Sequence, residues 1–129
     1  MRSMSQHSEH TGFLKNEQSK LLEQALHAGL FQICENNDSL ICSPAFCELL
    51  GYPKKANNLS KSFFFDQLVL PADREILLKA IQNNFQSGKQ FLLEIQLLHK
   101  AGAYKWFKIA GNTNRTSEGP ACMLCSIME

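Results

Sequence analysis

This sequence lacks a strong charge of either sign, a long apolar run and an apolar leader, and each absence excludes a class of protein. Its 129 residues carry a formal net charge of +1, so the composition provides no basic surface for nucleic acid or an anionic membrane. No apolar run approaches the roughly 18 residues that a membrane-spanning helix needs. Residues 1–13 lack the apolar segment of a secretory signal and are predicted to form a disordered tail or to be an expression remnant.

Cysteine is present in an odd number and without regular spacing, which argues against a disulfide framework. The five residues are Cys34, Cys42, Cys47, Cys122 and Cys125. Because no secretory signal accompanies them, we expect reduced thiols in a cytoplasmic protein, most simply as small buried hydrophobes. Cys122 and Cys125 are three residues apart. On a strand they would therefore point to opposite faces, where they cannot readily share a metal ion or pair with each other.

The length fits one domain with a hydrophobic core, because 44% of the residues are hydrophobic and 19% are charged. Residues 14–28 contain no glycine, proline or β-branched residue and are predicted to form an amphipathic helix that Gly29 ends. The apolar stripe of this helix includes Leu14, Leu21, Leu22 and Ala25. The helix could dock on its own domain or end a signalling coiled coil, and the stripe is too short to decide.

Two short strands and a short helix follow. Strands are predicted at Leu30–Glu35 and Ser39–Cys42, on either side of a turn-forming trio at residues 36–38. Ser43 and Pro44 then supply the cap and the first residue of a helix to Leu50. The elements are therefore a hairpin followed by a helix.

The middle of the chain is predicted to be a linker and helices. Lys54–Asn58 is a polar linker, and the three phenylalanines at residues 63–65 cannot all face one side of a helix. The longest internal helix begins at Pro71, and Ser87-Gly88 ends it. Its predicted buried stripe is Ile76, Leu77, Ala80, Ile81 and Phe85.

Three apolar runs near the C-terminus predict two consecutive β-hairpins. They are Phe91–His99, Tyr104–Thr113 and Ala121–Met128, separated by two short turn clusters. Helices grouped between a two-strand hairpin and a three-strand meander indicate an α+β domain, with one antiparallel sheet covered on one face.

These elements, with the residues at their joints, resemble a PAS domain that ends in a PAC motif. The most diagnostic pieces are Leu49-Leu50-Gly51-Tyr52 and the Gly-x-Tyr-Lys-Trp-Phe run at residues 102–107. The resemblance implies a PAS domain at residues 29–129, with a five-stranded antiparallel sheet whose inner face and helices enclose a small pocket. It also implies a sensory and dimerisation module of a bacterial signalling protein, such as a sensor kinase, a diguanylate cyclase or a chemotaxis receptor. Its effector would belong to the full-length protein.

The resemblance also implies which side chains would line the pocket. They are Phe46, Leu50, Phe64, Leu77, Ile81, Leu93, Ile95, Leu97, Phe107, Ile109, Cys125 and Ile127. Such a lining suits a small apolar or aromatic ligand, and it suits equally a filled core in a purely structural interaction module.

The other face of the sheet is predicted to bind a partner. Leu92, Leu98, Trp106 and Leu124 would point outward, and four large apolar groups on one face need a cover. The stripe of the helix at residues 14–28 is the simplest cover, from the same chain or from a second copy. We therefore expect a homodimer built from this face and this helix.

Neither catalysis nor a metal site is expected. The sequence has no Ser/His/Asp set, no phosphate-binding glycine loop and no zinc-peptidase motif, so we expect no enzyme. No second ligand pair at regular spacing accompanies the two C-terminal cysteines, so no metal site is expected. The resemblance implies that the last strand lies beside the first, so Cys34 could approach Cys125 or Cys122. A thiol redox sensor using Cys34 and Cys125 stays open as a third function.

Neither haem nor a flavin–thiol adduct is expected. The histidines are His7, His10, His27 and His99, and none lies on the helix that supplies the axial ligand in haem-binding PAS domains. Residues 57–68, where light-oxygen-voltage domains carry their reactive cysteine, contain no cysteine. A flavin bound without an adduct stays open.

Overall fold

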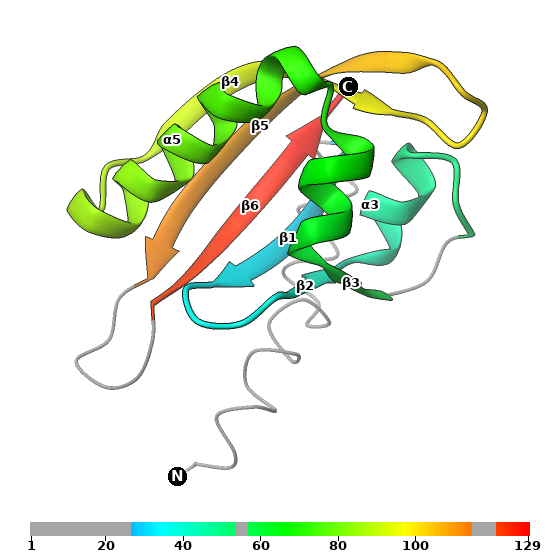
Figure 1. Cartoon of the computed structure of the whole chain (residues 1–129). Coiled ribbons are helices and arrows are strands. Elements are labelled where there is room, and N and C mark those ends of the chain that lie inside the picture. Colours follow the sequence, from blue (N-terminus) through cyan, green and yellow to red (C-terminus); the bar gives the residue numbers. More distant parts are fainter. Residues whose placement is uncertain (1–26, 54–56, 115–120) are drawn as a thin grey trace, which may run out of the picture.

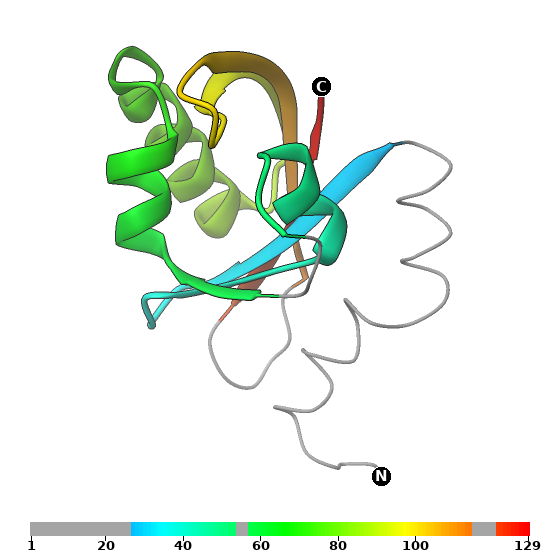
Figure 2. The ribbon, with the colours of Figure 1, turned by 90° about the vertical axis from the view of Figure 1, so that its right-hand side faces the viewer.

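The computed structural model describes residues 27–53, 57–114 and 121–129, so the predicted tail lies outside the described residues. In chain order the elements are β1 (Ala28–Cys34), β2 (Ser39–Cys42), α3 (Pro44–Leu49), β3 (Asn57–Ser60), α4 (Lys61–Phe63), the π-helical turn η1 (Phe64–Leu68), α5 (Pro71–Ser87), β4 (Phe91–Leu98), β5 (Tyr104–Asn114) and β6 (Cys122–Met128). The strands form one sheet, and the helices gather on one side of it (Figures 1 and 2).

The sheet has the strand order β3-β2-β1-β6-β5-β4, and all neighbouring strands are antiparallel. The predicted α+β class is confirmed, but the sheet has six strands where five were predicted. The added strand is β3, which pairs with β2 although its first half was predicted to be linker. Asparagine is depleted in strands, so the sequence of β3 gave no strand signal and its pairing with β2 decides the conformation.

Strand β1 begins where the predicted N-terminal helix was expected to end. Ala28 pairs with Met128 of β6, and His27 before it has a φ of 53°, in the left-handed region where a right-handed helix cannot continue. The helix predicted at residues 14–28 is therefore wrong at Ala28, which is a strand residue. Residues 14–26 of that helix lie outside the described residues. Gly29 is a strand residue that allows a close approach to α3, since a Cβ there would lie 2.5 Å from the Cα of Phe46.

The core fills the space between the inner face of the sheet and the helices. Phe31 of β1 lies at its centre, with ring centroids 5.4 Å from Phe46 of α3 and 5.2 Å from Phe64 of η1. All three rings are buried, whereas Phe63 is 40% exposed. The neighbouring phenylalanines thus do not all face the core, as their spacing predicted.

Helix α5 covers the β4–β5 side of the sheet with a narrow stripe. Leu77, Ile81 and Phe85 are buried at i, i+4 spacing, but Ile76 is 58% exposed, so its predicted place in the core was wrong. Residues at i and i+4 stack on one face, and Ile76 lies one residue to the side of that row. The buried Asn84 accepts a hydrogen bond from the hydroxyl of Thr113 on β5.

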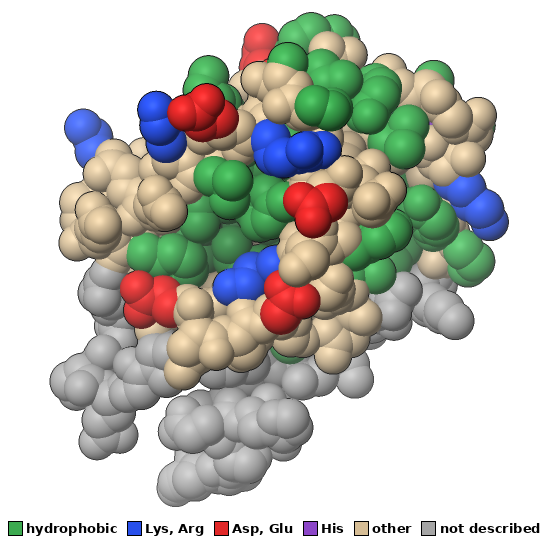
Figure 3. All heavy atoms as spheres, in the orientation of Figure 1, with side chains coloured by type: hydrophobic (Ala, Val, Ile, Leu, Met, Phe, Trp, Pro, Cys, Tyr) green, Lys and Arg blue, Asp and Glu red, His purple; other side chains and the backbone are tan. Residues whose placement is uncertain are grey.

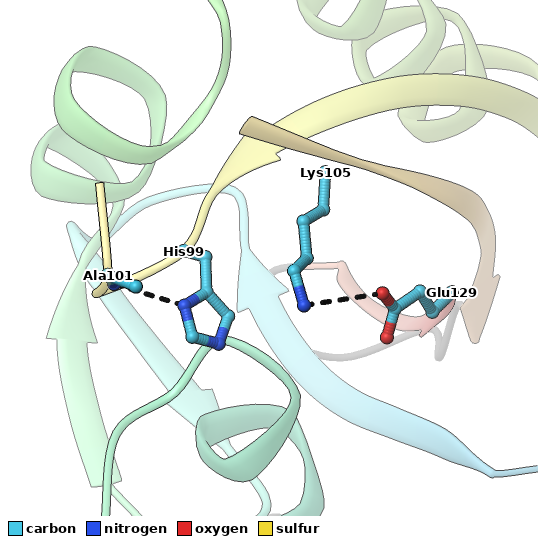
Figure 4. Close-up of polar contacts among 4 residues, drawn as sticks. All are labelled: His99, Ala101, Lys105 and Glu129. Atoms are coloured by element: carbon cyan, nitrogen blue, oxygen red, sulfur yellow. Dashed lines mark hydrogen bonds and ion pairs between the residues drawn. The ribbon is translucent and has the colours of Figure 1, made fainter. Parts of the chain in front are cut away.

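The β4–β5 turn lies against Gly51, close to the end of α3. There the backbone amide of Ala101 donates to Nδ1 of His99 at 3.0 Å (Figure 4). Gly51 leaves room for this imidazole, since a Cβ would lie 2.5 Å from its Cε1. The same figure shows the ion pair of Lys105 and Glu129. The Nζ and Oε2 atoms of this pair are 3.6 Å apart, and both side chains are exposed, so it contributes less than about 1 kcal/mol.

Cys34 and Cys122 form a disulfide, which corrects the expectation of reduced thiols throughout. The two residues lie directly opposite each other in the β1·β6 register, whereas Cys125 lies opposite Phe31. A redox pair of Cys34 and Cys125 is therefore wrong, because side chains of a strand alternate between its faces and these two point to different sides.

Candidate functional site

A cleft of about 610 Å³ opens between α5, the segment from α4 to η1, and the turn after β1. Figure 3 shows hydrophobic side chains in its hollow and charged side chains around the opening. The lining residues are Ile33, Glu35, Asp38, Lys61, Ser62, Phe65, Asp66, Leu78, Ile81, Gln82, Phe85 and Gln86.

The floor of the cleft is apolar and continues into the core. Ile33 comes from the inner face of β1, and Ile81 and Phe85 come from successive turns of α5; all three are buried. Phe65 is half-buried and packs edge-on against the core residue Phe64, with ring centroids 5.2 Å apart. A ligand in the cleft would therefore contact side chains that also support the sheet.

One side of the rim is held by hydrogen bonds between the β1–β2 turn and α4. The carboxylate of Asp38 accepts hydrogen bonds from the amide and the hydroxyl of Ser62, at 3.2 and 3.1 Å. The ammonium of Lys61 donates to the backbone carbonyl of Cys34 at 2.7 Å. These contacts tie the end of β1 to the start of α4, so the opening depends on both elements.

The polar groups around the opening are mainly hydrogen-bond acceptors. Three carboxylates, those of Glu35, Asp38 and Asp66, share the lining with the ammonium of Lys61 and with glutamine amides of α5. One oxygen of Glu35 accepts a hydrogen bond from the amide of Ala121 at 3.3 Å. The arrangement can bury an apolar group on the floor and accept hydrogen bonds from a donor at the rim.

The opposite face of the sheet exposes large apolar side chains along β4 and β5. Leu92, Trp106 and Tyr104 are 69%, 60% and 39% exposed. Glu94 and Lys108 lie opposite each other in the register on the same face. We call this surface the outer face.

A sequence model of the family described as PAS fold matches residues 39–127, from β2 into β6. The chain belongs to the PAS-fold family. The predicted family is thereby confirmed over β2, the helices and the three C-terminal strands. No curated protein is significantly similar to this chain. Across the described parts of the PAS domain, no helix combines the length and apolar character needed to cross a bilayer.

Several solved structures share this PAS fold. A sensory box histidine kinase/response regulator from Burkholderia thailandensis has a TM-score of 0.71 at 21% identity, over 87% of this chain and 83% of that chain. The N-terminal domain of a diguanylate cyclase with PAS/PAC sensor from Marinobacter aquaeolei has a TM-score of 0.64 at 18% identity, over 79% and 94%. The PAS domain of a Colwellia psychrerythraea protein has a TM-score of 0.63 at 17% identity, over 85% and 94%. At these identities the likeness shows the fold.

The residues predicted to line a pocket lie mostly in the packed core of the PAS domain. The buried ones are Phe46, Leu50, Phe64, Leu77, Ile81, Ile95, Leu97, Phe107, Ile109, Cys125 and Ile127, and Leu93 packs against them half-buried. Among the described residues, Ile81 is the one shared by this set and the lining of the cleft. The charged and amide groups of the rim were missed, because carboxylates at turns and glutamines on an exposed helix face carry no sequence signal for a cleft.

The residues predicted for the dimer divide into two groups. Leu92 and Trp106 lie exposed on the outer face, while Leu98 and Leu124 are half-buried. The helix residues Leu14, Leu21, Leu22 and Ala25 lie outside the described residues. The dimer therefore stays a prediction.

Potential metal or haem ligands do not converge in the described residues, which contain no group of three or more His, Cys, Asp or Glu side chains placed to hold an ion. His27 is exposed at the start of β1, and His99 lies in the β4–β5 turn, away from the cleft. Burial raises the pKa of the Cys125 thiol, which therefore stays protonated and acts as an apolar side chain.

Proposed function

We propose that this PAS domain is a sensory module of a cytoplasmic signal-transduction protein and that the cleft binds a small ligand. The observation that carries the proposal is the cleft itself. Its volume of about 610 Å³ is that of a small-molecule site, and its apolar floor lies under a few convergent polar groups. Two proteins with this fold, a sensory box histidine kinase and a diguanylate cyclase with a PAS/PAC sensor, support the sensory role. The proposal includes no catalytic step.

The lining favours a particular kind of ligand. Ile33, Ile81 and Phe85 favour an apolar or aromatic body of modest size. Because carboxylates outnumber ammonium groups around the opening, a cationic or hydrogen-bond-donating group would be favoured there. An amphipathic molecule with an amine or amide head fits both requirements.

Native mass spectrometry of the purified protein would detect such a ligand as an added mass. The informative variant is Gln82→Trp, which places a large ring at the exposed rim without disturbing the core; Ile81→Trp, on the floor, is a second. Ile76→Trp is the matched control, because Ile76 lies on the same helix, exposed and outside the lining. We expect the added mass to be lost in both cleft variants and kept in the control.

The alternative is a structural interaction module without a ligand. The observation that favours it is the packing of the predicted pocket residues into a filled core. Absence of any added mass, together with no change in thermal unfolding when amphipathic amines are supplied, would favour this alternative over sensing.

We propose further that a second copy of the chain binds the outer face, as the route by which a change in the cleft reaches an effector of the full-length protein. Leu92 and Trp106 provide the apolar contact. Glu94 and Lys108 carry opposite charges side by side, so a two-fold symmetric pairing can place each next to its opposite in the other copy.

Light scattering coupled to size exclusion tests the dimer. We expect Trp106→Arg, and deletion of residues 1–22, to shift the protein from dimer to monomer at tens of micromolar. Phe63→Arg is the control, since Phe63 is also an exposed aromatic residue but lies on α4, on the helix side of the sheet. A wild-type monomer at this concentration would overturn the dimer and leave the proposed ligand site untouched.

A further inference from the structure

The Cys34–Cys122 disulfide lies at a position where strand geometry brings two side chains together. The two residues are directly opposite in the β1·β6 register, and their Cα atoms are 4.0 Å apart. The amide of Glu35 donates to the carbonyl of Ala121 at 3.0 Å, just beyond the pair. The cysteines therefore occupy a non-hydrogen-bonded site of the ladder, where opposite side chains lie closest.

This pair differs from the other cysteines in its surroundings. Cys42, Cys47 and Cys125 are buried on the inner side of the sheet or in α3. Cys34 is half-buried at the end of its strand, whereas Cys122 is buried, so Cys34 is the side of the bond that is open to solvent. Reactivity in thiol–disulfide exchange depends on such access.

The disulfide is joined directly to the rim of the cleft. The carbonyl of Cys34 accepts the hydrogen bond of the Lys61 ammonium, and Glu35, the next residue, lines the opening. On the other strand, the amide of Ala121, next to Cys122, donates to the Glu35 carboxylate. The bond thus holds the end of β1 in the position from which it contacts both α4 and the start of β6.

We propose that Cys34 and Cys122 form a reversible thiol–disulfide site that regulates ligand binding in the cleft. The regulatory part rests on the proposed function. A low-molecular-weight thiol attacks one sulfur and forms a mixed disulfide, and a second such thiol releases the small disulfide. The protein gains two electrons and two protons as two thiols, and the two small thiols are oxidised to one disulfide. Reduction frees the end of β1, so Lys61 and Glu35 lose their fixed place at the opening.

Equilibration of the full chain in a series of reduced and oxidised glutathione mixtures tests the site. After acid quenching and alkylation, mass spectrometry should show that Cys34 and Cys122 become alkylated together as the mixture becomes more reducing. Before alkylation, the reduced protein should be about 2 Da heavier than the oxidised protein. Cys125→Ala should titrate like the wild type. If the disulfide survives excess reduced glutathione, it is purely structural. If it does not form even in excess oxidised glutathione, the two cysteines do not pair in solution. Either result overturns the proposal.

Methyl NMR tests the link to the cleft without any ligand. The δ1 methyl group of Ile81 reports from the floor of the cleft, on α5. We expect its resonance to shift between the oxidised and reduced protein by more than that of Ile76, the exposed reference on the same helix. In a Cys34→Ser/Cys122→Ser variant, added reductant should shift neither.

The two readouts separate the proposals. An Ile81 resonance that stays unchanged while the cysteines titrate would overturn regulation of the cleft. Failure to find a ligand by native mass spectrometry would instead overturn the proposed function, since the glutathione titration and the methyl shifts need no ligand.

Discussion

The carboxylate of Asp73, in the first turn of α5, accepts a hydrogen bond from the backbone amide of Gln96 on β4 at 2.8 Å. It joins the long helix to the edge strand of the sheet. We expect Asp73→Ala to destabilise the fold by about 1.5–3 kcal/mol, because a charged acceptor is removed from a part-buried amide. Urea denaturation measures this. Glu75→Ala is the control: its ion pair with Lys79 is exposed, and a loss of more than about 0.5 kcal/mol there would contradict the assignment.

Ser43 connects α3 to β1 through one buried hydroxyl. Its oxygen accepts hydrogen bonds from the amide of Phe46, as the helix cap, and from the amide of Leu30, at 3.3 and 3.0 Å. Ser43→Ala leaves both amides unsatisfied, so we expect a loss of about 2–4 kcal/mol in urea denaturation. Ser60→Ala removes an exposed cap from α4 and should cost only about 0.5–1 kcal/mol. Equal losses in the two variants would show that the second hydrogen bond contributes nothing.

Gly29 should tolerate no side chain. An added Cβ would meet the backbone of Phe46 at 2.5 Å, and backbone cannot move aside as a flexible side chain can. We expect Gly29→Ala to lower stability by about 3 kcal/mol and to reduce soluble yield. Gly88→Ala, at a φ of 76° with open space around it, should lose only about 1 kcal/mol. The reverse order of melting temperatures would contradict the close contact of β1 with α3.

The disulfide should contribute measurably to stability. It links residues separated by 88 positions, and a cross-link over such a loop stabilises a fold by about 2–4 kcal/mol, mainly by restricting the unfolded chain. We therefore expect a reductant to lower the urea midpoint of the wild-type protein. The Cys34→Ser/Cys122→Ser variant should unfold at the reduced midpoint with or without reductant. An unchanged wild-type midpoint would count against the bond.

Cys125 should make stability depend on pH in the alkaline range. Burial raises the pKa of this thiol above its ordinary value of 9.0, so the unfolded chain loses the proton first. The contribution of Cys125 is therefore complete below about pH 9 and falls as the pH rises, by about 1.4 kcal/mol at about pH 10. Comparing urea denaturation of the wild type with Cys125→Ala at both pH values isolates the effect. Parallel losses in the two proteins would show that other groups cause it.

Much of the fold was predictable because caps and apolar alternation act locally. Ser43 caps α3, Pro71 opens α5, and Gly88 ends it with a φ of 76°, as their residue types predict. Strand β3 was not predictable, since Asn58 favours turns and only its pairing with Ile41 of β2 makes it extended.

The site was less predictable than the fold. Cys34 meets Cys122 because of the β1·β6 register, which depends on the whole sheet and not on cysteine spacing. The cleft depends on how far α5 stands from η1, so its rim residues, such as Lys61 and Gln82, gave no local signal. Spacing placed Ile76 in the core, whereas the buried row of α5 runs through Leu77, Ile81 and Phe85 and leaves Ile76 exposed beside it.

The last strand in sequence, β6, holds a central place in the sheet, between β1 and β5. During synthesis on the ribosome, the β3-β2-β1 and β5-β4 ribbons therefore each keep an unpaired strand edge until β6 emerges and pairs with both. Such long-range pairing folds slowly, and an open edge can pair with another nascent chain. We infer that truncation within β6 would produce aggregation rather than a partly folded domain.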